Sequence, residues 1–391
     1  MTNTLQNDFP FALINTINLI NSIDQSLTMS ALKGIKIIEI AALGPAPFAG
    51  MMLADMGADV ILVERKADPK KNRVPDCNRR GKRSIALNLK NADDVEKLLQ
   101  LAEKADVLFE GFRPGVMERL GLSPDILQQR NPRLIIGRMT GWGQYGPLAH
   151  AAGHDINYIS LTGALRAIGR KGQKPVPPLN LVGDYGGGGM FLITGILAAL
   201  VERQNSGKGQ VIDVAMTDGS AVLMSVFNTL HAQGIWQTQQ GVNALDSGAH
   251  FYEVYETSDQ KYISIGPIEP AFYNLLIEKT GLDANEFAAQ YDPSKWSALK
   301  EKLSEFFKSK TQNDWCELLE GTDVCFAPVL NFIEAQQHPH NIARKTYVEL
   351  DGMVQPAPAP RFSRTPSEIQ FGSRAAGENS AEILEEWGVS I

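Results

Sequence analysis

Short apolar runs alternate with amphipathic segments along the chain from residue 34 onward. The runs GIKIIEI (34–40) and DVILVER (59–65) predict strands, and the second is apolar enough to be buried on both faces. The segment ADDVEKLLQLAEKA (92–105) repeats apolar residues at three- and four-residue steps, which predicts a helix with one buried face. The other expected elements of this part are a helix over 47–58 and strands over 106–112 and 133–141. Strands that alternate with helices predict βαβ units and a parallel sheet.

Glycine-rich loops replace this pattern near residue 150. Glycines and polar residues fill MTGWGQYGP (139–147), AAGHDINY (151–158) and LVGDYGGGG (181–189). Sites on parallel sheets are built from such loops, beyond the carboxyl ends of the strands. A long apolar helix is expected from residue 190 to a glycine stop, followed by a strand and turn over 210–219.

The chain changes character again after about residue 225. Residues 251–269 predict two short antiparallel strands joined at TSDQ (257–260), and residues 294–321 predict helix. From about residue 353 the chain is proline-rich and is expected to be extended.

These changes predict an α/β fold of two domains. A large domain with a Rossmann-like parallel sheet is expected over 29–225, and a smaller α+β domain with its linkers over 226–344. Residues 1–28 carry two charges, both acidic, and asparagines interrupt their apolar run. A secretory signal needs a basic start and an unbroken apolar core, and a membrane span needs a longer apolar run. We therefore interpret 1–28 as an extension that is dispensable for activity.

Composition excludes several classes of function. The chain has 391 residues, 43% of them hydrophobic, which is enough for a full core. A net charge of −7 and a pI near 5.5 argue against a nucleic-acid binder. The three cysteines lack metal-ligand spacing, so free thiols in a reducing cytoplasm are expected.

Dinucleotide binding is the first rival interpretation of the predicted sheet. Glu64 ends the second strand, where an acid that binds ribose would lie. However, the turn ALGPAPFAG (42–50) lacks the G-x-G-x-x-G pattern. Pro45 and Pro47 stand where free backbone amides would approach a pyrophosphate, so the pattern argues against this ligand.

Three titratable side chains are candidates for chemistry. Asp184 precedes four glycines and a helix, so it is either a helix cap or a base or nucleophile; the glycines favour a ligand close to the backbone. His154, beside Asp155, is either a proton carrier or a satisfied polar residue, as we expect of His150, His231 and His250. Glu269, in IGPIEPAF, is either a salt-bridged edge residue or a carboxylate that orients a histidine across a cleft.

Basic residues cluster in the first 120 residues. Solvated charge is expected for most of them, including those of NRRGKRS (78–84). Several nevertheless follow predicted strand ends, where a ligand that carries phosphate would lie.

Five segments then carry a resemblance to the α-methylacyl-CoA racemases of the family III CoA-transferase fold. They lie between Met29 and about Ser363, at 34–65, 105–122, 138–165, 175–204 and 266–272. The resemblance implies that His154 and Asp184 are proton carriers and that Glu269 hydrogen-bonds the histidine. The CoA contacts that it implies are Arg65, Leu87, Asn88, Leu89, Gly111, Arg113, Arg119, Gly153, Asp155 and Tyr158.

The same resemblance implies an interlocked homodimer. The large domain would be completed by 345–391, and each site would lie between the large domain of one subunit and the small domain of the other. The implied reaction interconverts the R and S epimers of 2-methylacyl-CoA thioesters through an enolate, with CoA as part of the substrate and no metal or other cofactor. We expect amides after Asp184 to stabilise the enolate oxygen. We also expect action in the cytoplasm without a membrane or nucleic acid.

Two other functions stay open. An acyl-CoA:carboxylate CoA-transferase would use Asp184 as a nucleophile, and it would have no use for a histidine opposite. A CoA-binding protein without catalysis would need neither proton carrier. Branched fatty acyl, sterol-derived and arylpropionyl thioesters are all compatible with the sequence.

Overall fold

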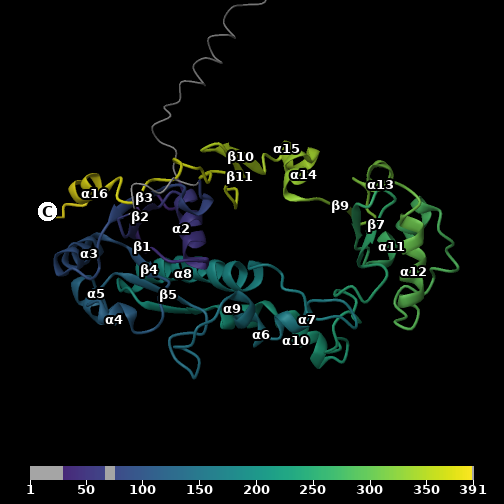
Figure 1. The fold of residues 1–391 in the computed structure, drawn as a ribbon, viewed down its shortest axis with the longest axis horizontal. Coiled ribbons are helices and arrows are strands. Elements are labelled where there is room, and N and C mark those ends of the chain that lie inside the picture. Colours follow the sequence, from purple (N-terminus) through teal and green to yellow (C-terminus); the bar gives the residue numbers. More distant parts are fainter. Residues whose placement is uncertain (1–29, 67–74, 390–391) are drawn as a thin grey trace, which may run out of the picture.

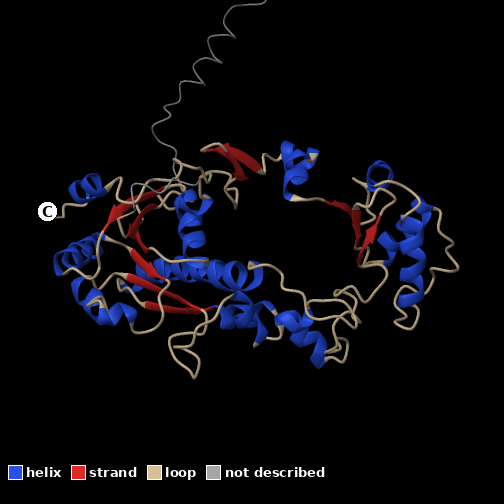
Figure 2. Cartoon of the chain, viewed as in Figure 1, coloured by secondary structure: helices blue, strands red, loops and turns tan. Residues whose placement is uncertain are grey.

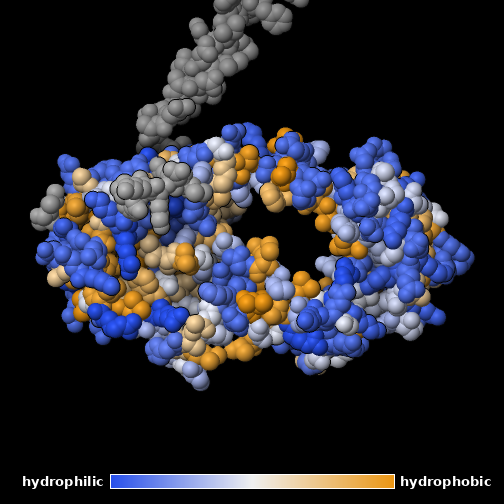
Figure 3. Space-filling model, in the orientation of Figure 1, coloured by the Kyte–Doolittle hydropathy of each residue, from blue (hydrophilic) through white to orange (hydrophobic). Residues whose placement is uncertain are grey.

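The computed structural model describes residues 30–66 and 75–389, so the predicted extension at 1–28 lies outside the described residues. The elements form a large group and a small group joined around an opening (Figure 1). Figure 3 shows that the opening passes through the molecule and that apolar residues lie on part of its rim. Both groups contain helices and strands (Figure 2).

A six-stranded parallel sheet forms the centre of the large group, in the order β3-β2-β1-β4-β5-β6. The strands are β1 (Lys36–Ile40), β2 (Asp59–Glu64), β3 (Lys82–Ala86), β4 (Val107–Glu110), β5 (Ile135–Thr140) and β6 (Val211–Ala215). This confirms the predicted Rossmann-like sheet. The strand order reverses between β1 and β4, and ligands bind at such a reversal, outside the carboxyl ends of the strands.

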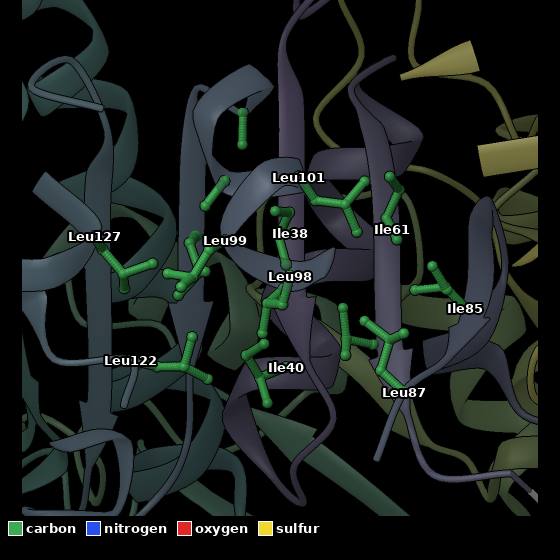
Figure 4. Packing of buried hydrophobic residues seen from close by; sticks show 14 of the residues in the cluster. Ile38, Ile40, Ile61, Ile85, Leu87, Leu98, Leu99, Leu101, Leu122 and Leu127 are labelled. Carbon is green, nitrogen blue, oxygen red and sulfur yellow. The ribbon is translucent and has the colours of Figure 1, made fainter. Parts of the chain in front are cut away.

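Alternate residues of β1 enter two separate cores, one on each face of the sheet. Ile38 packs in a core with α3 and the C-terminal helix α16, whereas Ile37 packs in a core with α2 and α8. Figure 4 shows the first core, where Leu98 and Leu101 lie over Ile38. The helices and short turns of the large group are α2 (Pro45–Asp55), η2 (Cys77–Arg79), α3 (Ala92–Lys104), α4 (Val116–Arg119), α5 (Pro124–Arg130), α6 (Asp155–Ser160), α7 (Ala164–Ala167), η3 (Leu181–Gly189), α8 (Met190–Ser206), α9 (Met216–Leu223), α10 (Ser225–Ala232) and α16 (Ser380–Glu386).

Three elements differ from the sequence prediction. The glycine-rich loop expected over 181–189 is the π-helix η3, and the turn expected after β6 is helix α9. The basic segment expected to be solvated is strand β3, whose Lys82 is almost completely buried and lies 2.5 Å from the carboxylate of Glu39. Arg79, Arg80 and Arg83 also pair with acids, so internal ion pairs occupy these charges.

Helix α8 continues the π-helix η3, and the stretch Leu181–Ser206 is the one helix of the described residues long and apolar enough to suit a membrane span. Its apolar residues Leu192, Ile193 and Ile196 are buried in the core that includes β1 and α2. Burial in this core therefore accounts for part of the apolar character of the helix, of whose most apolar window 44% is buried.

The small group has its own sheet and core. Antiparallel strands β7, β8 and β9 pack with helices around aromatic residues such as Phe251, Phe307 and Trp315. The remaining elements are β7 (Glu253–Glu256), β8 (Tyr262–Ile265), α11 (Pro270–Thr280), α12 (Trp296–Phe307), α13 (Gln312–Leu319), β9 (Phe326–Val329), α14 (Phe332–Gln337), α15 (Pro339–Ala343), β10 (Tyr347–Leu350) and β11 (Met353–Pro356). The chain then returns to the large group, where Ile383 and Trp387 join the first core. The domain boundaries at 225 and 344 stay a prediction.

His250 lies inside the small-group core and not at a surface or edge. Its ring is completely buried, its Nε2 lies 2.6 Å from the Tyr273 hydroxyl, and its Nδ1 has no hydrogen-bond partner among the described residues. Burial lowers the pKa of His250 to about 4. The folded protein therefore holds this ring neutral.

We predict that the free energy of unfolding falls as the pH falls from about 6.5 to about 4. The unfolded histidine gains its proton near its ordinary pKa of 6.5, whereas the folded ring stays neutral until about 4, so acid favours the unfolded chain. The full effect is about 3 kcal/mol. The free energy of unfolding, measured with urea across this pH range, should fall with falling pH in the native chain and should fall less steeply in His250→Gln. Equal slopes in the two proteins would contradict the assignment.

Candidate active site

A cavity of about 580 Å³ opens at the carboxyl ends of β1, β4 and β5. The loops that follow these strands contribute Gly44, Phe112 and Trp142 to its wall. Seven of the predicted site residues line it, namely Gly111, Arg113, Gly153, His154, Asp155, Tyr158 and Asp184. We call it the His154 cavity.

His154 stands at the start of α6, on an extended backbone that turns into the helix. Its amide donates to the side chain of Asn157 at 3.0 Å. The loop before it is held by Tyr158, whose hydroxyl donates to the carbonyl of Gly153 and whose ring meets Trp142 edge to face at 4.7 Å. The His154 side chain is exposed at the cavity wall, on a backbone fixed from both sides.

Asp184 lies inside the first turn of the π-helix η3, and it is not the helix cap. The helix begins three residues earlier, at Leu181, and its capping residue is Asn180. Asn180 Nδ2 donates to Asp184 Oδ2 at 3.1 Å, and Asp155 Oδ2 accepts the Asp184 amide at 2.7 Å. The carboxylate therefore has a fixed position in the His154 cavity.

Burial raises the pKa of Asp184 above its ordinary value. The hydrogen bond from Asn180 opposes this rise, the negative charge of Asp155 adds to it, and the charge of His154 opposes it. Burial, followed by the charge of Asp184, also raises the pKa of Tyr158. A carboxyl group with a raised pKa is better suited to take up and return a proton near neutral pH.

The glycines after Asp184 serve helix packing, which corrects the expectation that they admit a ligand. A Cβ atom at Gly187 would lie 2.6 Å from Ser220 Oγ on α9, and one at Gly189 would lie 2.7 Å from the Phe48 ring on α2. The first amide after Asp184 is also not free to bind an enolate oxygen. The Tyr185 amide donates to the carbonyl of Asn180, because these residues lie inside the helix.

A second cavity of about 510 Å³ lies along the same edge of the sheet. The predicted CoA contacts Arg65, Leu87, Asn88 and Leu89 line it, and we call it the Arg65 cavity. Phe112 lines both cavities, so they adjoin at the turn after β4. Arg65 and Arg113 have no ion-pair partner within 30–66 and 75–389, which leaves their charges available to an anion.

Two predicted site residues line neither cavity. Arg119 is exposed near the end of α4, and its guanidinium is close to Gly115. Glu269 is exposed at the start of α11 in the small group, whereas His154 belongs to the large group (Figure 1). No hydrogen bond joins Glu269 to His154 in the described part of this chain. The roles of both residues stay predictions.

Three residues that sequence reasoning passed over also shape the site. Asn180 donates to the Asp184 carboxylate, and Gly44 leaves room for it because a Cβ atom there would lie 3.1 Å from Asp184 Oδ2. Glu110 anchors the turn after β4 by accepting the Phe112 amide at 2.6 Å and the Arg138 Nε at 3.1 Å. Burial raises the pKa of Glu110 to about 7. The one signal for Glu110 in the sequence is an acid at the end of an apolar strand.

Residues 32–380 match the family described as CoA-transferase family III. The chain belongs to the family III CoA-transferases. It is 45% identical over 363 residues to a Mus musculus protein named alpha-methylacyl-CoA racemase, across 92% of this chain and 94% of that protein. It is 44% identical over 364 residues to a Homo sapiens protein of the same name, across 92% and 94% of the two chains. The crystal structure of a CaiB/BaiF family protein from Brucella suis is similar, with a TM-score of 0.79 and 26% identity over 92% of this chain and 100% of that one.

These matches confirm the family III CoA-transferase fold predicted from five segments of the sequence. The matched residues run from before β1 to the first residue of α16, so they cover both groups of elements. Both cavities belong to the part that is common to the family.

We predict that Gly44→Ala lowers the kcat of the reaction in the His154 cavity at least tenfold. Gly44 has φ +77° and ψ −121°, a conformation that costs other residues about 1–3 kcal/mol. Its new Cβ would also lie 3.1 Å from Asp184 Oδ2, so the carboxylate would have to move. Steady-state kinetics and thermal unfolding should be measured together.

Gly34→Ala is the matched control. Gly34 has φ +84° and nothing within 4 Å of a Cβ atom, so its substitution strains the backbone far from the site. It should lower the melting temperature and leave kcat almost unchanged. An equal loss of kcat in both variants would show that strain, and not the contact with Asp184, is responsible.

Proposed function

We propose that this chain is an isomerase that interconverts the R and S epimers of 2-methylacyl-CoA thioesters. The observation that carries this proposal is that an imidazole, His154, and a carboxylate with a raised pKa, Asp184, line one cavity. Similarity to two proteins named alpha-methylacyl-CoA racemase over 92% of the chain supports it.

The reaction needs two proton carriers and no net change in atoms. In one direction the Asp184 carboxylate takes the proton from the carbon next to the thioester carbonyl, and a planar enolate forms. A protonated His154 then gives a proton to the opposite face, which yields the other epimer. In the reverse direction the two residues exchange these roles, and each such carrier contributes about 100- to 10,000-fold to the rate.

The two adjoining cavities suit the two ends of the substrate. The thioester would lie in the His154 cavity and the adenosine end of CoA in the Arg65 cavity, with the connecting arm passing Phe112. Arg65 and Arg113 would then face the phosphates. The other described arginines near the sheet are largely paired with acids, so these charges cancel locally. Arg65 and Arg113 would therefore supply the positive charge for this anionic ligand in a protein that is acidic as a whole.

CoA transfer between carboxylic acids is the second candidate. Asp184 could act as a nucleophile in the same cavity. His154 favours the isomerase, because the transfer reaction has no step for an imidazole that shares the cavity with the carboxylate.

The deciding experiment incubates the protein with one epimer of a 2-methylacyl-CoA in deuterium oxide. We expect epimerisation with deuterium at the α carbon, measured by chiral chromatography and mass spectrometry, without a second carboxylic acid. His154→Ala and Asp184→Asn should each slow it by about 100- to 10,000-fold, with a smaller change in CoA affinity. Transfer of CoA to an added acid without α exchange would establish the second candidate instead.

We infer further that two chains interlock and that Glu269 of one completes the His154 cavity of the other. The exposed position of Glu269 on the small group and its lack of a bond to His154 of its own chain support this arrangement. A carboxylate bound to the ring would fix its tautomer and favour its charged form. We also infer a cytoplasmic site of action, away from membranes, which the three free thiols support.

Complementation tests the dimer. A chain with His154→Ala and Asp184→Asn is co-expressed with a Glu269→Gln chain, and mixed dimers are purified through two different tags. One site of each mixed dimer then has all three native residues, so we expect up to about half of the native activity from two defective chains. Activity no higher than the average of the two parent variants would refute a shared site.

A further inference from the structure

The side chain of Asp155 connects the backbones that carry the two proton carriers. Asp155 follows His154 in the chain and begins α6. Its Oδ2 accepts the amide of Asp184 at 2.7 Å, although the two residues are separated by 29 positions. One carboxylate therefore joins the first turn of α6 to the first turn of η3.

The residue before Asp184 is shaped to admit this carboxylate. A Cβ atom at Gly183 would lie 2.8 Å from Asp155 Cγ and closer still to Oδ2. Asp155 is adjacent in the chain to the proton carrier His154, and Gly183 is adjacent to the proton carrier Asp184. The contact between Asp155 and the Gly183–Asp184 backbone therefore joins the two carriers.

The hydrogen bond from the Asp184 amide requires an acceptor oxygen on Asp155 but does not require a negative charge. The side chain is 7% exposed, and its second oxygen, Oδ1, has no hydrogen-bond partner among the described residues. An asparagine would accept the same amide without placing a buried negative charge beside a second carboxylate, which opposes folding. The buried charge at this place therefore points to a use in the reaction.

We propose that Asp155 is a positioning residue that holds His154 and Asp184 at the spacing needed for proton transfer to opposite faces of one carbon. This inference rests on the proposed isomerase function. Asp155 does this through its side chain, independently of any contact between its backbone and the thioester.

The charge of Asp155 acts on Asp184 as well. The groups that influence the titration of Asp184 are Asn180 on its own element and His154 and Asp155 at the start of α6, and Tyr158 of α6 responds to its charge. From α2, the neighbour of the Asp184 carboxylate is Gly44, which carries no charge. Among these groups Asp155 is the one whose negative charge raises the pKa of Asp184.

Two substitutions separate position from charge. Asp155→Asn keeps an oxygen for the Asp184 amide and removes the charge. Its kcat should stay within about tenfold of native, and the acidic limb of its pH–rate profile should move to lower pH, because a nearby negative charge no longer raises the pKa of Asp184. Asp155→Ala removes the acceptor, and its kcat should fall about 100-fold in both directions, with a smaller change in KM.

Asp106→Asn is the matched control. Asp106 also accepts a backbone amide, that of Lys36 at 2.8 Å, and pairs with Arg203, but it lies at the amino ends of the strands, away from both cavities. This variant should be less stable to heat and should keep the native pH–rate profile.

The measurements are deuterium exchange and epimerisation of each epimer from pH 5 to 9, with thermal unfolding of every variant. If the native chain shows no α exchange, the proposed function fails, and the Asp155 inference fails with it. If the native chain is active and Asp155→Ala keeps native kcat, or Asp155→Asn keeps the native pH–rate profile, Asp155 is structural only. Should Asp155→Ala not fold, the profile of Asp155→Asn decides.

Discussion

The close approach of three helix backbones is the constraint on which the site depends. The π-helix η3 meets α2 and α9 where Gly187, Gly189 and Gly219 leave no room for a side chain. Interiors are packed so densely that one added carbon must displace a neighbour. Because η3 can lie this close to α2, the Asp184 carboxylate lies beside Gly44, the residue before α2. A wider spacing would withdraw the carboxylate from the cavity and open the contact to Asp155.

Much of the large group could be predicted from apolar periodicity, because its strands are buried on both faces and its helices on one. Strand β3 could not, since Lys82 and Arg83 give it the composition of a solvated loop. Their partners are Glu39 on β1 and Asp59 on β2, and only the folded sheet brings them within ion-pair distance. The prediction that the glycines after Asp184 admit a ligand was wrong for a related reason. A glycine needed for a neighbouring helix and one needed for a ligand are identical in sequence, and the packing alone distinguishes them.

Topology predicted only the edge of the sheet at which a ligand would bind, whereas the resemblance to the family supplied the individual site residues. Eleven of the thirteen residues that it implied line the His154 or Arg65 cavity, and both cavities lie at that edge. The strand order is that of dinucleotide-binding folds, yet Pro45 and Pro47 follow the first strand, and the turn before them contributes Gly44 to the His154 cavity. Glu269 shows the limit of this reasoning, since it follows no strand of this sheet and lines neither cavity, and only the resemblance assigned it a role.

The small group is inserted into the chain, so two segments tie it to the large group, one between α10 and β7 and one between β9 and β10 (Figure 1). A body on a single tether can swivel about any axis. A body held by two segments has fewer ways to move than one held by a single segment. Any movement of α11 relative to the large group must therefore change the course of both connecting segments.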